Sequence, residues 1–224
     1  MLFAQKKLPL ATPAEQARAA AAEPLAQREK EMSALLEEIW QDKLRHLPEF
    51  ASSIGDKRYN NQIRDYSIQA YNDQLSREQA FLLRLAAIDA TGFSEQEQIS
   101  RELMLRQFVE DQEASEFKEW EMPVNQMGGI FSTYPELVRR LSFKTVKDYD
   151  DWIARLYAIP HAFDQVTEEM EIGVEDKRVP PKYLLEQALE QVKELAHQKP
   201  EDSPLAMPLK SFPASIPASA VPHY

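Results

Sequence analysis

Apolar side chains recur at helical spacing along most of this chain, and the residues that interrupt helices fall between the repeats. From Leu25 to Leu47 the apolar positions are three or four residues apart, which places them on one face of a helix. Only five of the 224 residues are glycine, and all five lie between the expected helices. No stretch alternates apolar and polar residues as a half-buried strand does. The sequence therefore predicts an all-α fold, a bundle of long antiparallel amphipathic helices joined by irregular loops.

Capping residues and prolines predict where the individual helices begin and end. Ser94 and Glu97 form a capping box, in which each side chain accepts a hydrogen bond from a main-chain amide of the first turn. Thr145 is expected to cap a later helix, which Pro160 kinks or restarts, and Pro48 is expected to end the first helix and open a loop. The expected helices cover about residues 25–47, 67–92, 94–120, 145–173 and 179–198, with a short helical segment beginning at Pro135. Five aromatic residues at helical spacing are expected in the core: Trp40, Tyr71, Phe81, Phe108 and Trp152.

Composition divides the chain into three parts. Residues 1–24 are alanine-rich with little to bury and are expected to form a flexible lead-in, which Pro24 interrupts. Residues 25–198 hold the periodic segments and are expected to form the helical domain. Residues 199–224 form a Pro-rich tail with six prolines and no periodicity, as in a linker or a truncated helical region. We therefore expect the chain to be part of a longer protein.

Charge and cysteine content limit the classes of function. The net charge is −11, and an acidic protein repels phosphate backbones, so no nucleic-acid partner is expected. The chain has no cysteine, which excludes disulfides, a thiol nucleophile and Cys-ligated zinc. No apolar run approaches the ~20 residues that span a bilayer, so no membrane span is expected. The apolar stub Met1–Ala4 is too short for a signal-peptide core, and the compartment stays open.

The sequence offers little metal-binding or acid–base chemistry. It has four histidines and no H-E-x-x-H motif. Glu194 and His197 form one E-x-x-H pair, but a di-metal carboxylate bundle needs two such pairs and further glutamates. That bundle is the weakest alternative, because a histidine in the last turn of a helix is favoured by the helix dipole alone. The acidic run Glu168-Glu169-x-Glu171 is expected on a solvated helix face.

Two loop clusters are not explained by helix packing. In the segment "WEMPVNQMGG", the carboxamides of Asn125 and Gln126 can both donate and accept hydrogen bonds, which suits a peptide main chain or a neighbouring loop. Gly128 and Gly129 are expected to permit a main-chain path that is closed to other residues. A structural turn with its own hydrogen bonds is the alternative interpretation. The candidate residues of the two clusters are Asp56, Arg58 and Tyr59 in the first, and Trp120, Asn125, Gln126 and Gly128 in the second.

Four stretches in order carry a resemblance to a known family. They read "LPEFASSIGDKRYNNQIRDYS", "FKEWEMPVNQMGGIF", "FKTVKDYDDWIARLYAIPHAFDQ" and "GVEDKRVPPKYLLEQAL". Together they resemble the N-terminal part of the bacterial family called domain of unknown function 885, from about Glu29 to the end of the last expected helix. The order and spacing of the four stretches make the resemblance specific.

The resemblance implies a longer, largely helical protein. Members are often exported or lipid-anchored, which favours an exported or periplasmic location over a cytoplasmic one. Their C-terminal part carries a zincin-type H-E-x-x-x-H-like helix and a downstream glutamate, and they are regarded as metallopeptidase-like with a poorly defined substrate. Zinc is therefore expected in that missing part, and no cofactor is expected in this chain.

By the same resemblance, the N-terminal helices form one wall of a deep substrate groove. Asn125 and Gln126 would bind a peptide main chain, and the loop of Asp56, Arg58 and Tyr59 would brace the wall. The expected function is the helical substrate-groove portion of a metallopeptidase-like protein, inactive without the C-terminal catalytic part of the same gene product. The alternative is a stand-alone helical binding or scaffold module.

Overall fold

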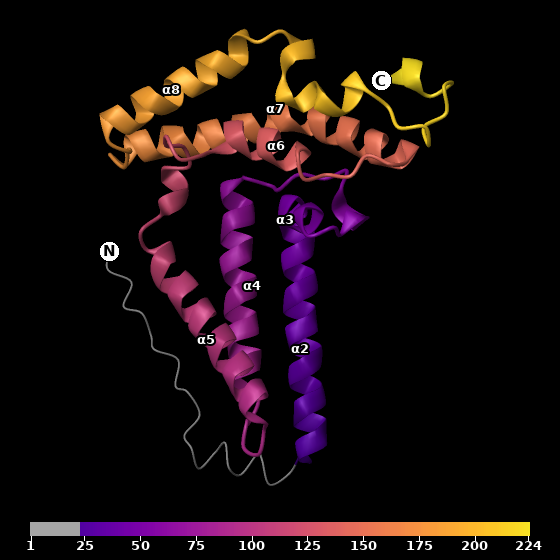
Figure 1. Cartoon of the computed structure of the whole chain (residues 1–224). Coiled ribbons are helices and arrows are strands. Elements are labelled where there is room, and N and C mark those ends of the chain that lie inside the picture. Colours follow the sequence, from indigo (N-terminus) through magenta and orange to yellow (C-terminus); the bar gives the residue numbers. More distant parts are fainter. Residues whose placement is uncertain (1–22) are drawn as a thin grey trace. The chain divides into compact units, whose positions relative to one another are not determined.

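The computed structural model describes residues 23–224, so nearly all of the expected lead-in lies outside the described residues. The described part consists of α-helices, short 3-10 helices and loops, and it contains no β-strand (Figure 1). The all-α prediction is thus confirmed for this part of the chain. The α-helices are α2 (Leu25–His46), α3 (Pro48–Ser53), α4 (Ile68–Ala87), α5 (Glu95–Ser115), α6 (Ile130–Val138), α7 (Val146–Glu175) and α8 (Lys182–His197). The 3-10 helices are η1 (Lys57–Tyr59), η2 (Glu119–Glu121), η3 (Pro200–Asp202), η4 (Pro204–Lys210) and η5 (Val221–His223).

The predicted helix caps are confirmed. The Ser94 hydroxyl accepts a hydrogen bond from the Glu97 amide, and the Glu97 carboxylate accepts one from the Ser94 amide, which completes the capping box of α5. Thr145 caps α7 in the same way, with Asp148 as its reciprocal partner. These contacts join residues three positions apart, which is why the sequence alone reveals them.

Two expectations about prolines are wrong, and of the two alternatives for Pro160 the restart is excluded. Pro48 does not open a loop but begins α3, because a proline in the first turn loses no helical hydrogen bond. The helix expected at Pro135 begins five residues earlier, at Ile130, because the buried face of α6 needs the residues that precede the proline. Pro160 lies inside α7, which continues to Glu175 without a second start. Burial along these helices outweighs the local penalty of the proline ring.

Two expectations about single aromatic residues also differ from the structure. Trp40 is 38% exposed and not in the core, because Leu36 and Ile39 already cover the buried side of α2. Trp120 lies in η2 and not in the preceding helix, since α5 ends at Ser115. The buried members of the expected aromatic set are Phe81, Phe108 and Trp152.

The described residues divide into two compact units, each with its own apolar core. The first unit comprises the chain up to Gln41 together with Asp73–Glu116, and in it α2, α4 and α5 lie side by side (Figure 1). Its core residues are Met32, Leu35, Phe81, Leu85, Ile88, Phe93 and Phe108. Leu85 and Phe108 are supplied by antiparallel neighbours, α4 and α5, which the short turn around Gly92 connects.

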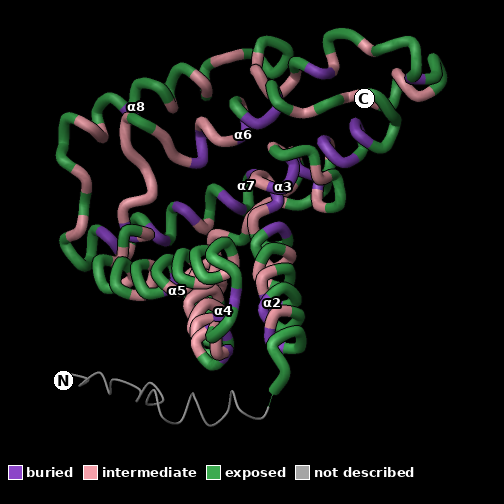
Figure 2. The backbone as a smooth tube through the Cα atoms, turned by 60° about the horizontal axis from the view of Figure 1, so that its bottom comes forward, coloured by how far each residue is buried: buried purple, intermediate pink, exposed green. Residues whose placement is uncertain are grey.

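The second unit comprises Asp42–Asn72 and Phe117–Tyr224, and its core lies between α6 and α7. Buried positions recur with helical spacing along α7 (Figure 2). The core residues are Ile130, Tyr134, Leu137, Val138, Trp152, Ile159, Ala162 and Val166. Part of the Pro-rich segment joins this unit, because Trp152 Nε1 donates to the Leu205 carbonyl at 3.0 Å and Ile216 is buried. The boundaries 1–24, 25–198 and 199–224 remain a prediction.

Candidate functional site

An apolar cavity of about 250 Å³ lies in the second unit, where α6, α7, α8 and η4 meet. Ile130, Phe131 and Tyr134 line it from α6, and Ile159, Leu195 and Leu205 line it from the other three elements. The cavity depends on the position of α8, whose apolar stripe buries only Ala188 fully against the unit. Val192, Leu195 and Ala196 of α8 line the cavity, and such an apolar surface is one that a ligand can cover.

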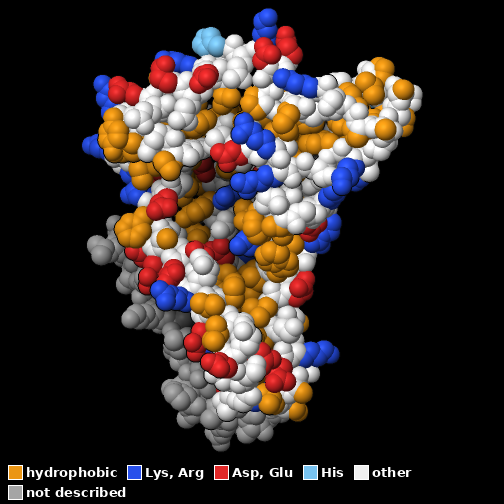
Figure 3. All heavy atoms as spheres, in the orientation of Figure 1, with side chains coloured by type: hydrophobic (Ala, Val, Ile, Leu, Met, Phe, Trp, Pro, Cys, Tyr) orange, Lys and Arg blue, Asp and Glu red, His pale blue; other side chains and the backbone are white. Residues whose placement is uncertain are grey.

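A second, polar cavity of about 320 Å³ adjoins the apolar cavity and shares Phe131, Pro135 and Leu195 with it. Its polar lining extends along α6 and the C-terminal half of α8 and comprises Ser132, Glu136, Arg139, Gln191, Glu194 and Gln198. We call the two cavities together the groove. On the face that carries α6 and α8, hydrophobic side chains lie among basic and acidic ones (Figure 3). The groove therefore combines apolar and hydrogen-bonding surface within one unit.

The loop of Asn125 and Gln126 leads directly into α6 and reaches the rim of the groove. Asn125 and Gly128 form an isolated antiparallel bridge, with N–O distances of 3.0 and 3.3 Å, and the Asn125 carboxamide oxygen accepts from the Met127 amide at 2.8 Å. The Asn125 side chain thus serves the turn itself. The Gln126 carbonyl accepts from Gln191 Nε2 at 3.3 Å, and Gln191 lines the polar cavity.

Two carboxamide oxygen atoms are buried and unpaired, one in the polar cavity and one in the loop beside it. Gln198 lines the polar cavity, whereas Gln126 lines neither cavity. Neither Gln126 Oε1 nor Gln198 Oε1 has a hydrogen-bond partner among residues 23–224. Because a buried carbonyl oxygen that accepts no hydrogen bond is costly by roughly 1–3 kcal/mol, such atoms are suited to a ligand that brings N–H donors. Gln126 was among the candidate residues, whereas Gln198 was not, since nothing in its local sequence distinguishes it.

The expectation that both glycines of this loop permit a main-chain path closed to other residues is wrong, and only Gly129 is required, for packing. Neither residue adopts the left-handed region, and Gly129, at φ 161°, has an extended main chain that any residue can adopt. A Cβ at Gly129 would lie 3.1 Å from the side chains of both Phe131 and Val124, so close packing explains this glycine. A Cβ at Gly128 would make only an ordinary contact, 3.6 Å from Ser132 Oγ.

Trp120, the remaining candidate of this loop, packs against an aromatic ring and not into the groove lining. Its ring centroid lies 5.9 Å from that of Tyr71. The neighbouring Glu121 is fully buried and is ion-paired with Lys118 at 2.8 Å and with Arg178 at 2.9 Å. These ion pairs hold η2, and with it the start of the loop, against the end of α7.

Gly173 allows this close approach. It lies inside α7, although all glycines were expected between helices. A Cβ at this position would overlap the carbonyl oxygen of Glu121 and lie 2.8 Å from that of Arg178. The glycine is therefore required by tertiary packing and not by its own main-chain conformation.

Asp56, Arg58 and Tyr59 form a local cluster around η1. The Asp56 carboxylate accepts from the Arg58 amide at 3.0 Å and from the Arg58 guanidinium at 2.6 Å, and hydrogen bonds from Arg58 lower the pKa of Asp56. The Arg58 guanidinium also lies over the Tyr59 ring, 5.3 Å from its centroid. None of the three lines either cavity of the groove. The structure thus does not bring the two candidate clusters together in one site.

A buried arginine of α7 holds this loop in place within the second unit. Arg155 of α7 is fully buried and donates to the carbonyl oxygen atoms of Gln62 at 2.7 Å and of Tyr59 at 3.1 Å. It also donates to Ser52 Oγ at 2.7 Å. Lack of solvent lowers the pKa of Arg155, yet the acceptors around it compensate its charge. No local pattern indicates this role, because the arginine lies about 100 positions from its acceptors.

An ion pair also joins η1 to the start of α7. Lys57 Nζ lies 2.6 Å from the Asp148 carboxylate, which also accepts from Thr145. Burial of Asp148 opposes its ionisation, but the hydrogen bonds from Lys57 and from the first turn of α7 lower its pKa to about 2. The charged form of Asp148 is thus favoured in the folded protein.

Behind the groove lies a largely buried polar cluster, formed by residues of α3, α6 and the loop before α4, that the sequence interpretation missed. The Glu49 carboxylate accepts from the Tyr134 hydroxyl and from the Arg64 amide, both at 3.0 Å. Burial, together with the nearby Glu49 carboxylate, raises the pKa of Tyr66 to about 12. The Tyr134 ring lines the apolar cavity while its hydroxyl belongs to this cluster.

Glu169 lies near this cluster and corrects the expectation of a solvated acidic face. It is only 6% exposed, and no hydrogen-bond or ion-pair partner of its carboxyl occurs in the described part of the chain. Burial raises its pKa to about 7, since the attraction of Arg64 offsets little of the lost hydration. Its spacing from the buried Ala162 and Val166 was the signal for this position, because all three share one face of α7.

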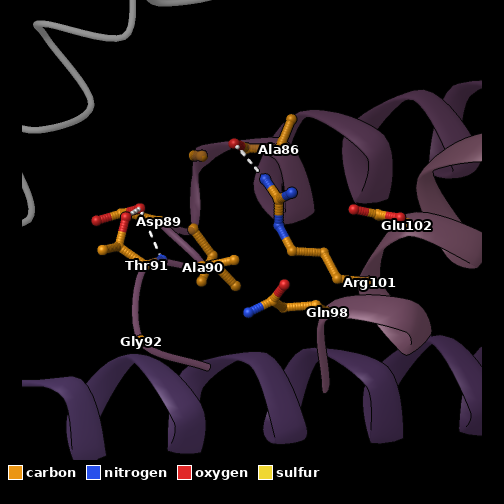
Figure 4. A pocket seen from close by; sticks show the side chains of 10 residues that line it. Ala86, Asp89, Ala90, Thr91, Gly92, Gln98, Arg101 and Glu102 are labelled. Atoms are coloured by element: carbon orange, nitrogen blue, oxygen red, sulfur yellow. Dashed lines mark hydrogen bonds between the residues drawn. The ribbon is translucent and has the colours of Figure 1, made fainter. Parts of the chain in front are cut away.

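A polar hollow in the first unit is lined by charged residues, among them Asp89 and Arg101, that already form hydrogen bonds with neighbouring groups of the protein (Figure 4). It has a volume of about 360 Å³ and lies at the turn between α4 and α5. Arg101 donates to the carbonyl oxygen atoms of Leu85 at 3.2 Å and Ala86 at 3.0 Å, and Arg28 donates to those of Asp89 and Thr91. Arg101 therefore caps the end of α4, Arg28 holds the turn that follows it, and no candidate residue lies here.

The described residues do not fit a zinc site. Over residues 23–224, no three His, Asp or Glu side chains lie together so that they could hold a metal ion. Of the E-x-x-H pair, His197 Nδ1 lies 2.6 Å from the Lys193 carbonyl oxygen, while Glu194 lines the polar cavity. We therefore assign no metal-dependent step to these residues.

The fold and the groove define an all-α protein with a mixed apolar and polar ligand-sized groove in its second unit. The family model described as Bacterial protein of unknown function (DUF885) matches residues 48–221, and the chain belongs to this family. No curated protein shows significant similarity to the chain. Among residues 23–224, no helix combines the length and apolar character needed to cross a bilayer.

Proposed function

We propose that the groove binds an extended peptide and that the chain supplies the substrate-binding wall of a metallopeptidase-like protein. The zinc-bearing catalytic part would be contributed by other residues of the same gene product. Asp56, Arg58 and Tyr59 would brace this wall through the loop that Arg155 holds in place. In this proposal the chain binds and orients the peptide but does not cleave it.

The observation that carries the proposal is a buried, unsatisfied acceptor in the polar cavity, with a second in the neighbouring loop, next to an adjoining apolar cavity. Gln126 Oε1 and Gln198 Oε1 have no donor in the described part of the chain, and a peptide main chain offers N–H donors at regular intervals. The apolar cavity, about 250 Å³ in volume, has room for one apolar side chain of that peptide. Peptide-binding sites commonly combine main-chain hydrogen bonds with side-chain pockets in this way.

Calorimetric titration with a synthetic tetrapeptide tests the proposal. The probe is Leu-Ala-Leu-Ala-amide, and its control is the same peptide N-methylated at the last three residues, which keeps the side chains but removes their main-chain N–H donors. We expect saturable binding of the first peptide and at least tenfold weaker binding of the second. Equal binding of both peptides, or of neither, would contradict the proposed main-chain recognition.

A variant that fills the apolar cavity provides a second test. Ala196 lines this cavity from α8, so Ala196→Phe is expected to block binding by occupying the space of the peptide side chain. The matched control is Leu189→Phe, which adds an aromatic ring at an exposed position of the same helix that lines neither cavity. Loss of binding in both variants would point to a disturbed α8 and not to a filled cavity.

A stand-alone binding module is the second candidate, because all lining residues of the groove belong to one compact unit. Both candidates predict that this chain binds the peptide. They differ in whether the full-length gene product, supplied with zinc, hydrolyses the peptide. Mass spectrometry of the incubated peptide distinguishes them, since cleavage supports the metallopeptidase-like protein and an intact peptide supports the module.

A further inference from the structure

We propose that the polar cavity binds the free amino terminus of the peptide, with the first side chain in the apolar cavity. This inference rests on the proposed peptide-binding function and adds the end of the peptide that the groove recognises. The inference is based on three observations: the charged residues of the polar cavity, the C-terminal ends of α6 and α8, and the residues that line both cavities.

Two unpaired carboxylates from two different helices line the polar cavity. Glu136 belongs to α6 and Glu194 to α8, and both line the cavity. Neither forms an ion pair or a hydrogen bond with any side chain or main-chain group that the structure describes. The cavity also contains one guanidinium, that of Arg139, so its formal charge is negative. A cationic ligand is therefore favoured over an anionic one.

The ends of two helices add to this negative potential. Glu136 lies in the last turn of α6, whose C-cap is Arg139, and Glu194 lies in the last turn of α8, whose C-cap is Gln198. The unpaired carbonyl groups at a helix C-terminus carry partial negative charge and attract cations. The buried Gln198 Oε1, which has no donor among the described residues, supplies a further acceptor for an ammonium group.

Because the two cavities share lining residues, a peptide amino terminus fits them better than a lysine side chain does. Phe131, Pro135 and Leu195 line both cavities, so the two spaces are immediate neighbours. In an N-terminal residue, the ammonium nitrogen and the side chain are both attached to the same Cα through bonds of about 1.5 Å. They can therefore enter the two cavities at once. The ammonium of a lysine lies at the end of a flexible four-carbon stem and carries no second apolar group into the apolar cavity.

Titration with two forms of one peptide tests the inference. Leu-Ala-Leu-Ala-amide with a free amino terminus is compared at pH 6.5 and low salt with its acetylated form, which retains every side chain. We expect the free form to bind at least tenfold more tightly, and this preference to disappear at pH 9.5, where the α-amino group with a pKa near 8 is neutral. An acetylated peptide with an internal lysine separates recognition of the amino terminus from recognition of any ammonium group.

Three charge variants test which residues of the polar cavity affect binding of the peptide's ammonium group. Glu136→Gln and Glu194→Gln are each expected to weaken binding of the free peptide several-fold and to leave binding of the acetylated peptide unchanged. Arg139→Gln is expected to strengthen binding of the free peptide, because it removes a like charge from the cavity. The control is Glu190→Gln, an exposed α8 glutamate that pairs with Lys193 and lines neither cavity.

Each outcome supports or overturns the inference. A preference for the free peptide that both glutamate variants reduce supports it. Equal or tighter binding of the acetylated peptide overturns it and leaves the proposed peptide-binding function intact, and tight binding only of the lysine peptide does the same. Absence of binding for every peptide overturns the proposed function, and the inference with it.

Discussion

Replacing Glu169 with glutamine is expected to stabilise the protein at neutral and alkaline pH. The wild-type carboxyl is 6% exposed, has no hydrogen-bond or ion-pair partner among residues 23–224, and burial raises its pKa from 4.5 to about 7. Glutamine has nearly the same shape as the protonated carboxyl but carries no charge. The substitution therefore removes the unfavourable ionisation and leaves the packing of α7 unchanged.

The magnitude and the pH range follow from the pKa values. Below about pH 4.5 the carboxyl is protonated in the folded and unfolded protein, and it does not affect the pH dependence. Between about pH 4.5 and pH 7 the unfolded protein loses the proton first, so the free energy of unfolding decreases as the pH rises. Above pH 7 the loss is complete and amounts to about 3 kcal/mol, at about 1.4 kcal/mol for each unit of pKa.

Urea denaturation of both proteins at several pH values between 4 and 8.5 measures the effect. The second unit contains Trp120 and Trp152, so tryptophan fluorescence reports its unfolding. We expect equal stability at pH 4 and an advantage of about 3 kcal/mol for Glu169→Gln at pH 8. The control is Glu171→Gln, at an exposed position two residues further along α7. A difference between Glu169→Gln and wild type that does not vary with pH would refute the reasoning.

Three further predictions concern packing and ion pairs. Gly173→Ala places a Cβ against two main-chain oxygen atoms and should lower the free energy of unfolding by at least about 2 kcal/mol, whereas Gly128→Ala should change it little; urea denaturation compares the two. Arg155→Met leaves several carbonyl oxygen atoms unpaired, so a loss of at least about 3 kcal/mol is expected, with faster hydrogen exchange over residues 57–62 if the loop is released. Asp148→Asn should lose about 2 kcal/mol at pH 7 and little at pH 2, because the lowered pKa stabilises the fold above about pH 4 and most of that stabilisation is lost as the pH falls to about 2; pH-dependent melting checks the sign.

Where the helices lie was predictable from the sequence in most cases. The periodic apolar positions of α8 and the capping boxes of α5 and α7 depend on residues three or four positions apart. Prolines misled the prediction at α3 and α6, because the favourable burial of apolar residues around Pro48 and Pro135 is a tertiary effect.

The candidate site was predictable only in part. The loop with Gln126 does reach the groove, through its contact with Gln191, whereas Asp56 and its neighbours lie in a separate loop. The groove itself depends on how α6, α7, α8 and η4 meet, and no local pattern encodes that arrangement. Gln198 and Glu136 can be identified as candidate binding residues only from the structure, because only the structure shows that both line the polar cavity.

The sequence by itself determined the helical class, the helix caps and the acidic character, since these depend on composition and on neighbours within one turn. Only the tertiary structure decided that Glu169 is buried, that Arg155 binds carbonyl groups about 100 residues away, and that Gly173 must lack a Cβ. The physical reason is that desolvation and close packing depend on which helix faces meet. A helix of given sequence has the same caps wherever it lies, but the environment of its side chains is set by the elements that cover it.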